Sequence, residues 1–301
     1  MSFESKISWP DDSKLVLAPL FLLESWPEDL GMAGSLNRGS DRSIPNNAVF
    51  KKDLSVIRDR WYGETVGIYR VLNILKNFSV QSTFFLNGRI ASRNTQLVKL
   101  MKEAGHEVAT ETYDHTYSFM KNYEEEKADI HRSIEEIRSS INERPVGYLS
   151  PGLKPTFNTP SILVEEKFRY WVDLDDDEWP YWMQTGKGRI LVIPNMRYLN
   201  DYSTFSESAR TPEDLFKIWK DTFDYLYDES GEGDGRLMLW DNHIFITGRP
   251  NRSAYLAKFI KYVLEHKGTK FSRADQVANW CYEGNMKLME KIWDESSISP
   301  P

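Results

Sequence analysis

The sequence has little cysteine and no excess of basic charge. Its 301 residues include one cysteine, Cys281, which excludes an internal disulfide and a metal site built from several cysteines. Lys and Arg number 38 against 45 Asp and Glu, giving a net charge of -7 without a basic stripe. This balance argues against nucleic acid and against an anionic membrane surface as partners.

Long apolar runs and two common catalytic motifs are also missing. The longest apolar run, LVLAPLFLL at 15–23, is too short to span a bilayer. The first 14 residues lack the basic and apolar segments of a signal peptide, so we expect a cytoplasmic protein. Neither a G-x-S-x-G motif nor a Gly-rich phosphate loop occurs, so serine hydrolase and nucleotide chemistry have no support.

Short apolar runs alternate with helical patterns along most of the chain. Strands are predicted at 14–24, 80–88, 106–110, 146–152, 170–177, 188–194, 235–243 and near 269. Helices are predicted at 63–78, 92–105, 123–141, 159–168, 211–230 with Thr211 as its cap, and 251–268. Seven or eight strand–helix units predict an α/β fold, a distorted and incomplete (β/α) barrel. A doubly wound open sheet is the alternative.

We expect one catalytic domain over residues 1–301. The polar stretch 25–60 is too long for an ordinary connection and is expected to lie on the active-site side. Residues 283–301 are expected to form a C-terminal helix or tail. With 40% hydrophobic residues, the chain can build a sizeable core.

Acidic and histidine side chains recur where the predicted strands end. The set comprises Glu24, Glu111, Asp114, His115, Ser150 to Gly152, Asp175 to Asp177, Asp201 and Asp241 to His243. Barrels of this kind place their active sites at the carboxyl ends of the strands. Any one of these residues can be a loop polar group or a helix cap, but the set favours a functional site. His106, His131 and His266 are taken as structural.

Four motifs together resemble the polysaccharide deacetylase superfamily, the chitooligosaccharide-deacetylase homology fold. They are STFFLNG (82–88), EAGHEVATETYDHT (103–116), GYLSPG (147–152) and NHIFITGRPNR (242–252). The resemblance covers about residues 14–282. Further segments, such as YGETVGIYRVLNIL and DDEWPYW, are similar to a branch with cyclic imide hydrolases, allantoinase-like ring-opening enzymes and a peptidoglycan-deacetylase-like group.

The resemblance implies roles for individual residues. An aspartate pair at the first strand end supplies a base and a metal ligand in the family, and these positions hold Leu22 and Glu24 here. The two metal histidines fall on Glu111 and His115, and the histidine that protonates the leaving amine falls on His243. Glu24, Glu111 and His115 are therefore the expected metal ligands.

The metal and the general base are left open. Two carboxylates and one imidazole suit Zn, Mn, Fe or Mg, and a metal-free site is the alternative. Because Leu22 cannot act as a base, Asp114, Asp177 and Asp201 are candidates. Without a metal, Glu24 or Glu111 would be the base, with His115 as its partner.

The expected catalytic residues are His243, Glu24 and Asp201. We expect His243 to face the substrate from the side opposite the Glu24 and Glu111 carboxylates, with Asp241 raising its pKa. The expected substrate contacts come from Ser150 and Pro151 in the groove motif and from Asp177, Trp179 and Tyr181 in a rim loop.

These residues predict a hydrolase of non-peptide C–N bonds that acts on a small amide, a cyclic imide or ureide, or an N-acyl compound. A metal-dependent carbohydrate N-deacetylase is one alternative. A binding protein that has lost the chemistry is the other. The expected partner is a small-molecule substrate, and a homo-oligomer is also open.

Overall fold

The computed structural model describes residues 7–28, 49–50, 52–207, 210–231, 234–284, 286 and 288–293, so part of the expected 25–60 loop lies outside the description. The described strands are β1 Leu15–Leu23, β2 Thr83–Leu86, β3 Glu107–Thr110, β4 Gly147–Tyr148, β5 Tyr170–Trp171, β6 Tyr181–Thr185, β7 Gly188–Val192, β8 Arg236–His243, β9 Thr269–Phe271 and β10 Glu290–Ile292. The described helices are α1 Leu54–Tyr62, α2 Ile68–Asn77, α3 Gly88–Arg93, α4 Thr95–Glu103, α5 Tyr123–Ile141, α6 Thr159–Glu165, α7 Pro212–Glu229, α8 Ile244–Thr247, α9 Pro250–Leu264 and α10 Ala274–Tyr282.

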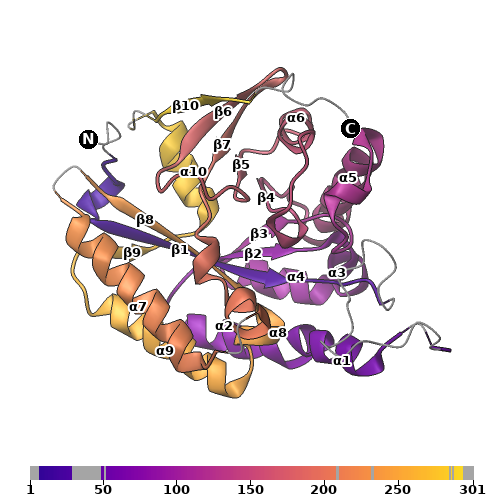
Figure 1. The fold of residues 1–301 in the computed structure, drawn as a ribbon, viewed down its shortest axis with the longest axis horizontal. Coiled ribbons are helices and arrows are strands. Elements are labelled where there is room, and N and C mark those ends of the chain that lie inside the picture. The colour runs from indigo at the N-terminus through magenta and orange to yellow at the C-terminus, as the bar shows by residue number, and fades with distance from the viewer. Residues whose placement is uncertain are drawn as a thin grey trace.

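The described strands form one sheet in the order β10-β6-β7-β5-β4-β3-β2-β1-β8, with β9 also paired to β1. Among these strands, β10 and β8 end the order without pairing to each other, so the barrel is not closed. Helices α2, α7 and α9 lie outside β1 and β8, and the β6–β7 hairpin lies across the molecule from them (Figure 1). The expected distorted, incomplete (β/α) barrel is confirmed.

Strand β1 is buried along its whole length and separates two cores. Leu17 and Phe21 face outward into the cluster formed with α2, α7 and α9. Val16 and Leu20 face inward into a cluster that α10 completes. A parallel strand covered on both faces needs a continuous apolar run. This strand could therefore be predicted from the sequence.

The helix expected at 63–78 begins earlier and is interrupted. Helix α1 and helix α2 are joined by a π-helical turn, η2 Gly63–Gly67. A Cβ at Gly67 would lie 2.7 Å from the carbonyl oxygen of Ile244, so glycine lets this turn pack closely against α8. This contact supports the chain directly after His243.

The structure adds two strands that the sequence pattern did not predict. β6 pairs antiparallel with β7, in a stretch read as a rim loop, and β10, within the segment expected to be a C-terminal helix or tail, pairs with β6. Thr211 does cap α7 as expected, accepting a hydrogen bond from the Asp214 N–H at 3.2 Å. In the described part of the chain, no helix is long and apolar enough to cross a membrane.

A buried carboxyl group, Glu107, attaches α10 to the amino ends of the strands. Its oxygens accept hydrogen bonds from Thr83 Oγ1 at 2.7 Å, Tyr170 OH at 2.8 Å and the Asp275 N–H at 2.9 Å. Burial, together with the nearby Asp275 charge, raises the pKa of Glu107 to about 8.

This raised pKa predicts a pH-dependent stability. The folded chain holds the Glu107 proton more tightly than the unfolded chain, whose ordinary value is 4.5. The stability contribution is therefore complete below about pH 4.5 and is lost as the pH rises through about 8. Glu107→Gln keeps the hydrogen-bonding shape without the charge, so its free energy of unfolding should fall less over this window.

Urea unfolding at a series of pH values measures this difference. Glu103→Gln, an exposed carboxylate on α4, is the control and should follow the wild type. An identical slope in wild type and Glu107→Gln would contradict the assignment.

Candidate functional site

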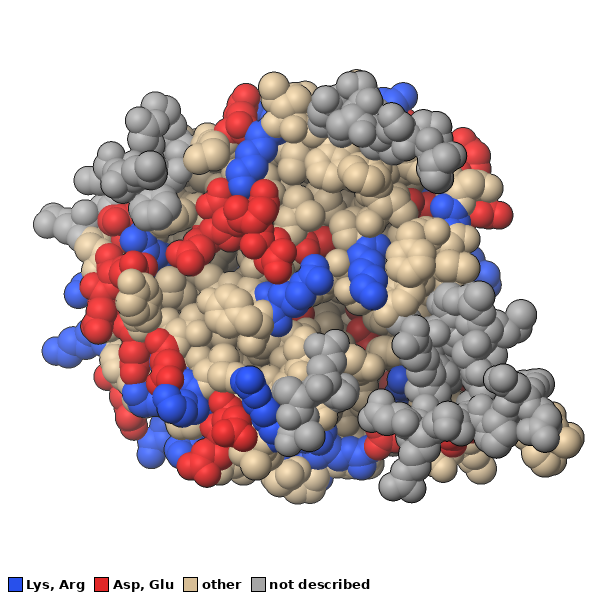
Figure 2. All heavy atoms as spheres, in the orientation of Figure 1, with Lys and Arg blue, Asp and Glu red and all other residues tan. Residues whose placement is uncertain are grey.

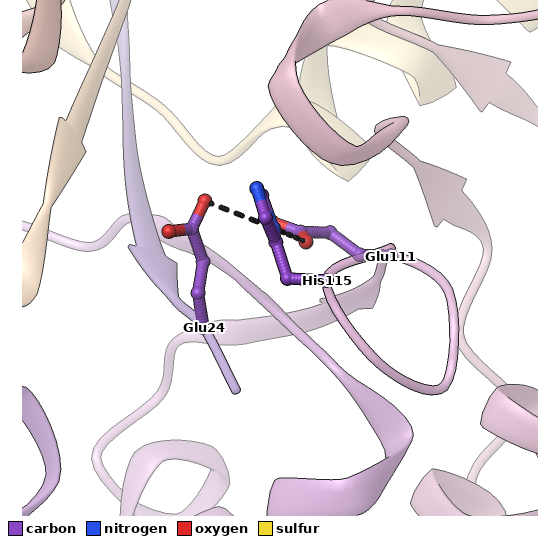
Figure 3. A group of neighbouring side chains, drawn as sticks. All are labelled: Glu24, Glu111 and His115. Carbon is purple, nitrogen blue, oxygen red and sulfur yellow. Dashed lines mark hydrogen bonds and ion pairs between the residues drawn. The ribbon is translucent and has the colours of Figure 1, made fainter. Parts of the chain in front are cut away.

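The candidate functional side chains lie at the carboxyl ends of β1, β3 and β8, which the sheet places in the order β3-β2-β1-β8. Glu24 directly follows β1, Glu111 directly follows β3 with His115 in the next loop, and His243 is the last residue of β8. The parallel register that pairs Leu22 with His243 brings the ends of β1 and β8 side by side. Figure 3 shows Glu24, Glu111 and His115 pointing toward one another from these separate segments.

His115 lies between two carboxylates. Its Nδ1 is 3.0 Å from Glu111 Oε2 and 3.4 Å from Glu24 Oε1, and all three side chains are buried (Figure 3). Asn87 braces the group, because its amide donates to Glu111 Oε2 at 3.2 Å while its oxygen accepts from the Ser25 N–H at 2.7 Å. The strand ends are thereby tied together through side chains.

Trp26 closes one side of this group. Its indole N–H donates to Glu24 Oε2 at 2.6 Å, and its ring stacks on His115 with centroids 4.4 Å apart. The guanidinium of Arg60, from α1, lies 3.4 Å from the Trp26 ring centroid. An aromatic ring in this position excludes water from the carboxylates and fixes the Glu24 rotamer.

His243 is held by Asp201 rather than by Asp241. Asp201 Oδ1 lies 2.7 Å from His243 Nδ1 and accepts the His243 backbone N–H at 3.0 Å, while Thr247 Oγ1 donates to Asp201 Oδ2 at 2.6 Å. The other ring nitrogen, Nε2, lies 3.4 Å from Glu24 Oε1. The expected position opposite the carboxylates is therefore wrong, since His243 contacts Glu24 directly.

Mutual contact sets the protonation of these groups. Burial alone would raise the pKa of Glu24, but the charges of His115 and His243 outweigh it and hold that pKa at about 2. Burial and the Glu24 charge raise the pKa of Glu111 to about 7. Burial alone would lower the pKa of His243, but Glu24 and Asp201 raise it well above its ordinary value.

The three expected ligands form a potential divalent-metal site. Glu24, Glu111 and His115 each offer one donor atom, and these atoms lie within 4.8 Å of one another. Glu111 Oε1 is buried without a hydrogen-bond partner among the described residues, so one ligand oxygen is uncommitted. Two carboxylate oxygens and one imidazole nitrogen are a donor set that Zn, Mn, Fe or Mg accepts, so the residues fit a metal.

A cavity of about 270 Å³ opens over these residues. Its lining comprises Leu22, Glu24, Trp26, His115, Tyr117, Leu149, Gly152, Leu153, Lys154, Arg197, Asn200, Tyr202, Ser203, Asp241 and His243. Asn200 donates to Asp241 Oδ2 at 2.7 Å, and burial raises the pKa of Asp241 to about 6. The volume is suited to a small molecule or to one end of a larger one.

Three of the expected substrate contacts do not reach this cavity. Asp177 pairs with Lys291 at 2.9 Å, Trp179 is buried in the inner core, and the Tyr181 hydroxyl donates to Asp176 at 2.7 Å. They were misplaced because the chain beyond β5 turns into the unpredicted strand β6. Trp179 and Tyr181 are consequently core residues rather than rim residues.

The groove motif reaches the cavity through Leu149 and Gly152 rather than through the expected pair. Ser150 is fixed by its backbone N–H to Asp173 Oδ1 at 2.7 Å, and both Ser150 and Pro151 are buried outside the cavity lining. Leu153 and Lys154, the two residues after the motif, also line the cavity. The cavity lining therefore continues a few residues beyond the expected contacts in the same turn.

The remaining expected residues have structural or separate positions. Asp114 pairs with Arg89 beside the neighbouring hollow behind Trp26. His106, His131 and His266 contact Ser82, Glu166 and Tyr262 respectively. None of these four side chains lines the cavity described above.

Several lining residues were missed, and most follow a recognised strand end by a few positions. Trp26 comes two residues after Glu24, Tyr117 two after His115, and Lys154 four after Ser150. Reading up to four residues beyond each residue already singled out would have found them. Asn200 and Tyr202 flank Asp201, which the sequence had already singled out.

Comparison with known proteins assigns the family. The polysaccharide deacetylase family model matches residues 59–171. A Schizosaccharomyces pombe protein that carries the polysaccharide deacetylase name is 25% identical over 300 residues, covering 90% of this chain and 91% of its own. The Helicobacter pylori peptidoglycan deacetylase is 24% identical over 256 residues, covering 74% and 86%.

A solved structure of Puue allantoinase superimposes with a TM-score of 0.79 at 27% identity, covering 92% of this chain and 93% of its own. The family match, the near full-length relatives and this superposition agree with the motifs at the strand ends. The chain therefore belongs to the polysaccharide deacetylase superfamily and is a hydrolase of non-peptide carbon–nitrogen bonds.

Proposed function

We propose that this protein hydrolyses an amide-type C–N bond in a small molecule, namely a cyclic imide or ureide or an N-acyl compound. The observation that carries the proposal is the small cavity in which the buried Asp201–His243 pair meets Glu24. The likeness to an allantoinase, an enzyme named for a cyclic ureide, supports a ring substrate.

His243 is the group that would protonate the departing nitrogen. An amide nitrogen leaves poorly as an anion, so hydrolysis requires a proton donor at that atom. Asp201 accepts the Nδ1–H and so directs the Nε2–H toward the cavity and Glu24. Because two donors of His243 and one of Thr247 in α8 converge on Asp201, the orientation of the imidazole is fixed before substrate binds.

Glu24, Glu111 and His115 are the residues that would hold a divalent ion. When bound, such an ion would polarise the substrate carbonyl and lower the pKa of water. The chain's own residues exclude bulk water there, since Trp26 covers Glu24 and His115.

Position 22 holds a leucine, so another residue must act as the general base. Asp241 is a better candidate for this role than Glu24. Of the described residues that line the cavity, Glu24 and Asp241 carry carboxylates. The pKa of Glu24 is held at about 2, whereas that of Asp241 is raised to about 6. A base with a pKa near the working pH accepts a proton from water more effectively.

Carbohydrate N-deacetylation is the second candidate function. The potential metal site of Glu24, Glu111 and His115 and the likeness to a peptidoglycan deacetylase favour it. A screen of hydantoin, dihydrouracil, allantoin, succinimide and N-acetylated chitooligosaccharides separates the two. Ring opening without acetate release supports the proposal, acetate release alone supports the alternative, and an inert protein supports a binding role.

His243→Ala should lower kcat by about 10²–10⁴ on the best substrate of this screen, because the departing nitrogen loses its proton donor. Asp201→Asn should also lower kcat, because the amide no longer selects the same imidazole tautomer. Thermal unfolding of both variants provides the control for structural damage. A near-normal kcat with a lowered Tm would make His243 a packing residue.

Asp241→Asn should lower kcat/KM and remove a titration near pH 6. As a base, Asp241 acts when ionised, so wild-type kcat/KM should rise with pH through about 6. Asn200→Ala removes a hydrogen bond that favours the ionised carboxylate, so it should move this rise to higher pH. An unchanged pH profile in both variants would exclude Asp241 as the base.

Metal content tests the ligand group. Protein incubated with Zn or Mn and then gel-filtered should retain about one ion per chain, and Glu111→Gln should retain less. Glu126→Gln, another buried carboxyl that contacts Thr156 and Thr159, is the control and should match the wild type. Equal metal content in all three proteins would rule out Glu111 as a ligand.

A further inference from the structure

Two cationic side chains line the cavity from separate loops. Lys154 follows the short helix η4 Pro151–Leu153 after β4, and Arg197 begins η5 Arg197–Leu199 after β7. Basic side chains also border the hollow near the centre of the face viewed in Figure 2. The cavity's own carboxylates, Glu24 and Asp241, are buried. The cavity thus has acidic groups at depth and cationic groups at its exposed side.

Lys154 has no carboxylate partner within ion-pair distance in the described part of the chain. Its Nζ lies 4.4 Å from the Tyr117 ring centroid and 3.5 Å from the Tyr117 hydroxyl. Gly152, with φ of +65°, allows this approach, because a Cβ there would lie 2.7 Å from the Tyr117 ring. The ammonium group is held beside the cavity by an aromatic ring, and no described carboxylate forms an ion pair with it.

Arg197 is anchored but only weakly paired. Its Nη2 donates to the Leu153 carbonyl at 3.2 Å, in the same turn that carries Lys154. Its acidic neighbour is Asp175, at 3.6 Å, and both side chains are about half exposed. Exposed pairs of this kind contribute little, so a ligand carboxylate can replace Asp175 at small cost.

We propose that Lys154 and Arg197 bind a carboxylate of the substrate, so that the natural substrate is a small amide, imide or ureide that bears a carboxylate. The inference rests on the proposed function for the position of the scissile bond. A ligand carboxylate is repelled by Glu24 and Asp241 and attracted by the two cations, which orients the molecule. Its amide end is then directed toward His243.

Matched pairs of compounds that differ by a carboxylate test this specificity. Dihydroorotate is compared with dihydrouracil, and N-acetylmuramic acid with N-acetylglucosamine, by calorimetric binding to the 301-residue chain. We expect the carboxylated member of at least one pair to bind about 10-fold or more tightly, since hydrogen bonds to charged groups contribute at this level. The preference should weaken as salt is added.

Lys154→Met and Arg197→Met should each reduce binding of the carboxylated compound about 10-fold, with a much smaller effect on its neutral partner. Lys99→Met, an exposed lysine on α4, is the matched control and should bind as the wild type does. Three outcomes would overturn the inference. They are equal affinity for both members of each pair, no binding of any compound, and variants that lose affinity equally for charged and neutral compounds.

Hydrolysis of the same compounds is measured separately. If the carboxylated compound binds through Lys154 and Arg197 but no compound of either pair or of the earlier screen is hydrolysed, the proposed function fails and the binding site stands. The proposed function stands and the carboxylate site fails if two results are found together. Neutral compounds are hydrolysed as fast as their carboxylated partners, and the Lys154 and Arg197 variants affect both kinds of compound equally.

Discussion

The site depends on one buried carboxylate, Glu24, that contacts two imidazoles. A carboxylate without compensation is costly to bury, and here His115 and His243 each lie 3.4 Å away while Trp26 donates a hydrogen bond. The three partners come from the ends of β3 and β8 and from the residues that follow β1. Misplacing any of these ends would leave charge unpaired in the interior, so the strand arrangement and the site geometry constrain each other.

The surrounding packing supplies the accuracy that this group requires. The all-buried β1 sets the register that places Leu22 beside His243, and Asn87 joins Ser25 to Glu111 across β2. The glycine-lined π turn at η2 packs against the helix that follows His243. Ser25, Asn87 and the η2 glycines do not line the cavity, yet each limits where a candidate catalytic side chain can lie.

The sequence predicted those parts of the fold that local patterns encode. Continuous apolar runs marked β1 and β8, and the polar residues after them marked Glu24 and His243. The pairing of Asp201 with His243 joins residues 42 apart, and no local pattern specified it in preference to Asp241. Strand β6 was missed because its stability comes from pairing with β7. As a result, Asp177, Trp179 and Tyr181 were wrongly predicted to contact the substrate.

The same contacts explain how the chain tolerates Leu22 where its family places a base. A carboxylate at that position would lie beside His243 and close to Glu24, adding a negative charge to a site already rich in carboxylates. With Leu22 the inner wall is apolar, and the second carboxylate of the cavity comes from β8, where Asn200 holds one oxygen of Asp241. Proton acceptance and proton donation are then assigned to two residues of one strand, Asp241 and His243. In the proposed mechanism β8 would supply the acid and the base, while β1 and β3 would supply the metal ligands.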